Sequence, residues 1–110
     1  LILFKEQSHP GRCIVAYKDH VSEIVNLTDE ERSAFFADVN RAANAIHKAF
    51  HPEKVNYGAY GDTGCHLHFH LVPKYRDGFE WGGVFAMNPK QTYLTDEQYA
   101  EMIEKIKSNL

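Results

Sequence analysis

The sequence is poor in cysteine, has no surplus of basic residues and contains no long apolar run. Its two cysteines, Cys13 and Cys65, form no Cys-x-x-Cys pair and have no secretory context that would imply a disulfide framework. No stretch approaches the ~20 apolar residues that cross a bilayer, and no charged-then-apolar leader precedes a small-residue cleavage site. We therefore expect a cytoplasmic protein that is neither secreted nor inserted in a membrane.

The net charge and the length of the chain limit its possible partners and its number of domains. The formal net charge of −3 lacks the excess of Lys and Arg by which proteins hold long DNA or RNA, so we expect no long nucleic acid as a partner. The chain has 110 residues, of which 44% are hydrophobic and 25% are charged, as in an ordinary globular protein. This length predicts a single domain over residues 1–110.

Short apolar runs predict a sheet built from two strand pairs. Residues 1–4 and 13–17 flank the turn at Pro10-Gly11, and residues 55–60 and 66–73 form the second pair. The run 13–17 lacks alternation, which predicts a strand buried on both faces. We expect His9 to be an exposed turn residue. Residues 77–88, which include three glycines, predict either an ordered loop or a further edge strand.

Two capping boxes mark the starts of two helices. Thr28 with Glu31 begins a helix over residues 29–50, and His51-Pro52 ends it, because the residue before proline disfavours the α region. Thr95 with Gln98 begins a C-terminal helix. Apolar side chains recur at helical spacing in both segments. The prediction is an α+β fold: an antiparallel sheet of about five strands, one long central helix and a C-terminal helix.

The run His66-Leu67-His68-Phe69-His70-Leu71-Val72 carries the chemistry. Strand side chains alternate, so the three imidazoles share one face and the apolar side chains share the other. One interpretation is a solvated strand face that is merely rich in histidine. A second is a metal site, since imidazole is a common zinc ligand. A third is a catalytic row for an elongated anionic substrate.

Strand geometry argues against one metal ion held by all three histidines. At ~3.3 Å per residue the Cβ atoms of His66 and His70 should lie about 13 Å apart, whereas zinc needs ligand nitrogens only ~2 Å away. We therefore expect no required metal. We also expect no cofactor. Neutral imidazole can attack phosphorus, and the glycine-rich loop from Gly61 to Gly64, with Thr63, can bring backbone amides and a hydroxyl to a phosphate.

The triad run resembles the signature of the histidine triad (HIT) family. The likeness extends to Asn56-Tyr57-Gly58 and Gly61-Asp62-Thr63, which are similar to the phosphate-contacting loop before the triad, and to residues 10–20, PGRCIVAYKDH. The resemblance implies a bacterial-type histidine triad nucleotide-binding hydrolase. Such a protein binds purine nucleotides and cleaves phosphoramidates, dinucleoside polyphosphates or adenylates at the α-phosphorus. It also implies a homodimer.

The same resemblance implies a role for each site residue. His68 would be the nucleophile, His66 would orient it, and His70 would bind phosphate or the leaving group. The residues implied in substrate binding are Asn56, Thr63, Gly61, Glu6 near the ribose, Arg12 and Trp81. We expect Trp81 either to cover the site, from its own or a partner subunit, or to anchor its loop to its own core.

Two positions depart from the family pattern. Arg12 stands where many members have a further histidine, and Asp62 stands where glutamine is common beside the phosphate. An arginine can serve an anionic ligand, whereas an aspartate repels one unless it is turned away. The alternative function is therefore a catalytically weak nucleotide-binding module that acts through protein partners.

Overall fold

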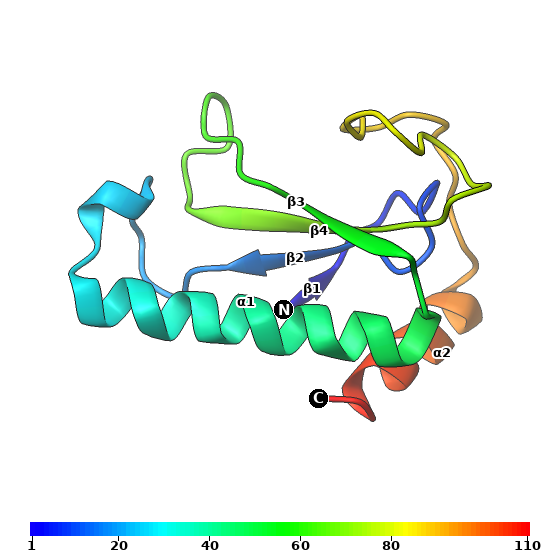
Figure 1. Cartoon of the computed structure of the whole chain (residues 1–110), viewed down its shortest axis with the longest axis horizontal. Coiled ribbons are helices and arrows are strands. Elements are labelled where there is room, and N and C mark those ends of the chain that lie inside the picture. The colour runs from blue at the N-terminus through cyan, green and yellow to red at the C-terminus, as the bar shows by residue number, and fades with distance from the viewer.

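The computed structural model describes residues 1–110 and places a sheet on one long helix (Figure 1). The elements in chain order are β1 (Ile2–Leu3), β2 (Cys13–Ala16), the 3-10 helix η1 (Ile24–Asn26), α1 (Asp29–Phe50), β3 (Lys54–Gly58), β4 (His68–Lys74) and α2 (Asp96–Lys107). The α+β class, the long helix and the C-terminal helix are confirmed, but the sheet has four strands where about five were expected.

Helix α1 begins and ends where its local signals predict. The Thr28 hydroxyl accepts a hydrogen bond from the Glu31 backbone N–H, and the Glu31 carboxylate accepts one from the Thr28 N–H at 2.8 Å. Acidic residues occupy its first turn, where they stabilise the positive end of the helix. His51 ends the helix in the left-handed region at φ 51°, immediately before Pro52.

The sheet is antiparallel throughout, with strand order β1-β2-β4-β3. Strand β4 therefore lies between two partners, and its register places His70 opposite Ile14 of β2 and Gly58 of β3. Because side chains alternate along a strand, His68 and His70 share one face while Phe69 and Leu71 share the other. The register thus separates a polar face from a core face.

The hydrophobic core lies between the sheet and α1, which runs along one face of the strands (Figure 1). Leu71 and Cys13 contribute fully buried side chains from the sheet, and Ile46 contributes one from α1. Helix α2 packs against α1 through its buried Ile106. No helix is both long enough and apolar enough to cross a membrane.

Two expectations about the strands were wrong in detail. Strand β4 begins at His68, so His66 precedes it. Strand β2 is not buried on both faces: Cys13 and Val15 are buried, while Ile14 and Ala16 are only partly buried because they lie on the histidine face. Of the two alternatives for the glycine-rich segment 77–88, the structure has the loop, since the segment contains no strand.

Segment 77–88 forms a loop because its backbone turns repeatedly. Glu80 and Gly82 have positive φ angles of 59° and 89°, which an extended strand does not allow. The Lys74 ammonium donates to the Glu80 carbonyl at 2.6 Å and to the Gly83 carbonyl at 2.9 Å, which satisfies backbone groups that a sheet would otherwise pair.

The expectation that His9 is exposed was also wrong. Its side chain is buried because it pairs with the Glu80 carboxylate at 2.6 Å and packs against the Phe79 ring. Glu80 also accepts a hydrogen bond from the Ala86 N–H. His9, Glu80 and Lys74 together fasten the 77–88 loop to the sheet.

Candidate active site

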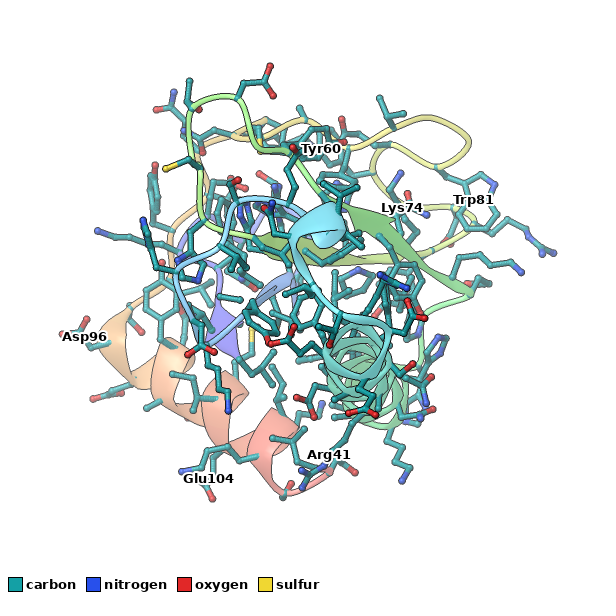
Figure 2. All side chains as sticks on the ribbon, turned by 90° about the vertical axis from the view of Figure 1, so that its left-hand side faces the viewer. Arg41, Tyr60, Lys74, Trp81, Asp96 and Glu104 are labelled. Atoms are coloured by element: carbon teal, nitrogen blue, oxygen red, sulfur yellow. The ribbon has the colours of Figure 1, made fainter.

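The candidate site lies on the sheet face away from α1. Figure 2 shows Tyr60, Lys74 and Trp81 on this side of the sheet and Arg41 on the helix side. His68 is partly exposed on β4, whereas His70, two residues further on, is buried. The rings of His68 and His70 are adjacent, with centroids 5.2 Å apart. The structure therefore brings the second and third histidines of the triad together.

The first histidine of the triad, His66, lies just before strand β4. His66 Nε2 donates a hydrogen bond to the carbonyl of Tyr17, the residue that follows β2, and this bond connects the triad segment to the end of that strand. Its ring also lies beside that of His20, with centroids 5.5 Å apart. His66 is thereby fixed, and its backbone carbonyl is held at the start of β4.

That carbonyl decides the tautomer of His68. His68 Nδ1 lies 2.7 Å from the His66 carbonyl oxygen, which can only accept a hydrogen bond. In the neutral imidazole the proton is therefore on Nδ1, and Nε2 carries the free lone pair. Nε2 makes no hydrogen bond within the chain. This arrangement leaves a nucleophilic nitrogen available at a partly exposed ring.

His70 is enclosed by aromatic rings and one buried cation. The rings of Phe4, Tyr60 and Phe85 lie 5.3, 6.3 and 6.0 Å from its centroid. Arg12 Nη2 lies 3.1 Å from His70 Nδ1. Burial, followed by the charges of Arg12 and His68, lowers the pKa of His70 to about 4. His70 is therefore neutral at physiological pH.

A cavity of about 180 Å³ adjoins His68. It lies between η1 and the loop that joins β3 to β4, and its lining includes Glu23, Val25, Tyr60, Gly61 and His68. Figure 1 shows this loop and η1 at the same end of the sheet. A larger cavity of about 510 Å³ lies between β2 and α1 and touches none of the three histidines. The smaller cavity is thus the one placed for chemistry at His68.

The β3–β4 loop approaches the triad closely. A Cβ atom on Gly64 would lie 3.7 Å from the His68 ring, so the loop backbone passes beside the imidazole. Gly61 lines the cavity, and Thr63 lies exposed between these two glycines. Asn56 is opposite Val72 in the register, which puts it on the histidine face one step beyond Gly58 and His70.

Glu6 and Trp81 lie away from the triad. Both Glu6 carboxylate oxygens already accept hydrogen bonds, from Ser8 and from the Thr92 N–H at 2.7 Å. Burial acts to raise the pKa of Glu6, but the hydrogen bonds from Ser8 and Thr92 and the charge of Arg12 bring it below its usual value. Trp81 lines a separate cavity of about 270 Å³ with Lys54, Asn56 and Lys74.

The sequence offered no signal for the aromatic wall around His70. Phe85 comes from the 77–88 loop and Tyr60 from the loop after β3, and neither belongs to a motif. Gly58 permits this packing, because a Cβ there would lie 2.6 Å from the Phe85 ring and 2.8 Å from the Tyr60 ring. No cluster of three His, Cys, Asp or Glu side chains is arranged to hold a metal ion.

Comparison with known proteins identifies the family. The HIT domain family model matches residues 2–77. "Protein hit" of Bacillus subtilis is 27% identical over 105 residues, which cover 91% of this chain and 68% of that protein. "AP-4-A phosphorylase" of Mycobacterium tuberculosis is 33% identical over 81 residues, which cover 68% of this chain and 38% of that protein.

Solved structures agree with this assignment at the level of the fold. A histidine triad protein from Sinorhizobium meliloti superposes with a TM-score of 0.90 at 24% identity, covering 98% of this chain and 80% of that one. One from Marinobacter aquaeolei gives 0.88 at 22% identity, covering 98% and 79%. Together with the family match over residues 2–77, these findings show that the chain belongs to the histidine triad (HIT) family.

Proposed function

We propose that this chain is a nucleotide hydrolase or nucleotidyl transferase that cleaves purine nucleotides at the α-phosphorus through a covalent nucleotidyl-His68 intermediate. The observation that carries the proposal is the tautomer of His68, whose Nδ1–H is committed to the His66 carbonyl and whose Nε2 is free. The Mycobacterium tuberculosis relative is named an AP-4-A phosphorylase, and this name supports chemistry on a nucleotide. A phosphoramidate is the substrate with which we propose to test the chain first.

The reaction proceeds in two balanced displacements. His68 Nε2 attacks the α-phosphorus, a phosphorus–nitrogen bond forms, and the bond to the leaving group breaks as that group takes up a proton. Water then attacks the same phosphorus, the phosphorus–nitrogen bond breaks, and His68 returns to its neutral form as the water proton passes to solvent. Each displacement needs donors for the charge that develops on the phosphate oxygens.

We assign the remaining candidate site residues to contacts with the phosphate, to orientation of His68 and to contacts with the rest of the nucleotide. His70, neutral and beside His68, binds a phosphate oxygen, while Asn56, Gly61 and Thr63 contact the phosphate from β3 and the loop. His66 orients His68 through its carbonyl. Glu6 takes the ribose hydroxyls only if it releases Ser8 or Thr92, and Trp81 contacts the substrate from the Asn56 side.

Trapping the intermediate tests this function. Brief reaction with labelled adenosine 5′-phosphoramidate should leave label on His68 through a bond that acid breaks and alkali spares. His68→Ala should lower turnover about 10⁴-fold or more while folding and product binding persist, because the side chain is partly exposed and its loss removes the nucleophile. His66→Ala and His70→Ala should lower turnover less, since orientation and phosphate contacts are separable.

His47→Ala is the matched control, because His47 is exposed on α1. It should keep full turnover. Substantial turnover in His68→Ala, with contamination by the unmutated enzyme excluded, would disprove the nucleophile assignment. Nucleotide binding without label or turnover in the unmutated protein would instead support the alternative, a catalytically weak binding module that acts through partners.

We also propose a homodimer that acts in the cytoplasm. Strand β3 is one of the two edge strands of the sheet and exposes Tyr57, and a chain of this size gains buried surface by association. Both cysteines, Cys13 and Cys65, are free thiols, as is usual in a reducing compartment. Light scattering that finds only monomer at micromolar concentration would exclude the dimer.

A further inference from the structure

Arg12 is a fully buried cation beside the third histidine. Its guanidinium lies over the rings of Phe4 and Phe85, with its central carbon 4.2 and 4.9 Å from their centroids. Nη1 donates to the Ala86 carbonyl at 2.9 Å, and Nη2 lies 3.1 Å from His70 Nδ1. Nε has no partner. The only side-chain hydrogen-bond acceptors of Arg12 are thus His70 and, weakly, Met87.

No carboxylate pairs with this cation directly. The ion pairs of the chain are His9–Glu80 and Arg32–Asp29, and Arg12 belongs to neither. Burial lowers the pKa of Arg12, while the more distant charges of Glu6 and Glu80 raise it. A guanidinium remains protonated in proteins, so a fixed positive charge stays in this apolar setting. A buried charge without a direct counter-ion is costly, which argues that the contact it makes matters.

We infer that Arg12 is a positioning residue that holds His70 as a neutral imidazole with its proton on Nε2, so that His70 is a permanent hydrogen-bond donor to the substrate phosphate. This inference rests on the function proposed above and adds a residue outside the triad to it. Its basis is geometric. The guanidinium has donors and no acceptor, so His70 Nδ1 must accept, and a neutral ring then carries its proton on Nε2.

The same contact prevents a second proton from binding to His70. A proton on Nδ1 would face an Arg12 N–H 3.1 Å away and would place two positive charges together. The other groups around His70 are the His68 imidazole and the Phe4, Tyr60 and Phe85 rings, and none of them supplies a negative charge. The low pKa of His70, about 4, agrees with this environment.

This arrangement restricts the part that His70 plays in the reaction. A ring that stays neutral above about pH 4 binds a phosphate oxygen through Nε2–H throughout the physiological range. It does not hold the extra proton that a leaving group would need. In the first displacement the leaving group therefore takes its proton from solvent or is already protonated when the substrate binds, and His70 stabilises the phosphate charge.

Nitrogen NMR of the unmutated chain tests the inference without substrate. The ring ¹⁵N shifts of His70 should report the Nε2–H tautomer from pH 7.5 to pH 5, with no protonation in that interval. Arg12→Met should populate the Nδ1–H tautomer and raise the pKa of His70, because it removes both the donor and the charge. Arg12→Lys should retain most of the original tautomer, because it keeps a cationic donor. Arg41→Met, on the helix side of the sheet, is the charge-matched control and should change neither property (Figure 2).

Steady-state kinetics with adenosine 5′-phosphoramidate supplies the second readout. Arg12→Met should lower kcat/KM about tenfold or more and move the acid limb of the pH profile upward, while label still forms on His68. Arg12→Lys should recover most of the kcat/KM. A His70 tautomer, pKa and pH profile in folded Arg12→Met equal to those of Arg41→Met would show that Arg12 is only structural.

The unmutated protein keeps the test decisive if Arg12→Met does not fold. An Nδ1–H tautomer for His70, or a pKa near its ordinary value of about 6.5, would overturn the inference on its own. This outcome is distinct from failure of the proposed function. That failure would appear as absence of label on His68 and absence of turnover, whatever the tautomer of His70.

Discussion

The burial of a neutral histidine predicts a specific loss of stability in mild acid. His70 has a pKa of about 4 in the folded chain, and an exposed histidine in the unfolded chain has one of about 6.5. Between these values the unfolded state binds more protons than the folded state, so the free energy of unfolding falls as the pH falls. The effect is absent above about pH 7 and complete below about pH 4.

The size of the loss follows from the two pKa values. Proton linkage gives a loss from His70 of about 2 kcal/mol at pH 5 and about 3 kcal/mol at pH 4, relative to pH 7. Glu6 and Glu31 have lowered pKa values, so these carboxylates also lose stabilising charge at low pH. The contribution of His70 must therefore be measured as a difference between two proteins.

His70→Gln provides that difference, because glutamine does not titrate. Urea unfolding followed by far-ultraviolet circular dichroism at pH 7, 6, 5 and 4.5 gives the free energy of unfolding of each protein. The unmutated chain should lose about 2 kcal/mol more than His70→Gln between pH 7 and pH 5. Equal pH dependence in the two proteins would mean that His70 protonates at its ordinary pKa. That result would contradict the conclusion that burial among the aromatic rings and the charge of Arg12 lower the pKa of His70.

Other predictions concern the cap, the aromatic wall and metal dependence. Thr28→Ala should lower the free energy of unfolding by about 1 kcal/mol in urea, because α1 loses its capping hydroxyl; no change would exclude a role for the cap. Gly58→Ala should lower turnover while the protein stays folded at the assay temperature, because the new Cβ displaces Phe85 and Tyr60 from His70. Unaltered turnover in this variant would contradict that packing role. Activity should survive a chelator, since we expect no required metal; loss that zinc restores would refute this.

Local patterns sufficed for much of the fold. The bounds of α1 and the start of α2 agree with the two capping boxes, because a cap acts on backbone groups within three or four residues. Alternation along residues 66–72 correctly separated the histidine face of β4 from its core face. The tautomer of His68 is almost as local, since its partner carbonyl is only two residues away.

The sequence did not reveal which residues meet across the fold. The strand signal extended two residues too far, because His66 leaves the ladder to reach Tyr17. The glycine-rich 77–88 segment was compatible with a strand or a loop until its contacts with Lys74 and His9 were known. His9 was misjudged for the same reason: its partner Glu80 is 71 residues away.

The sequence by itself determined the helices and the sheet class, because periodicity, caps and strand alternation act over a few residues. The choice of His68 as the candidate nucleophile came from the resemblance of the triad run to the HIT family. Only the tertiary structure decided the state of His70. Arg12 lies 58 residues from it in the chain, and Phe85 and Tyr60 come from separate loops. A proton's position on a buried imidazole depends on the donors, charges and solvent that surround the ring, and these are assembled only when distant segments pack together.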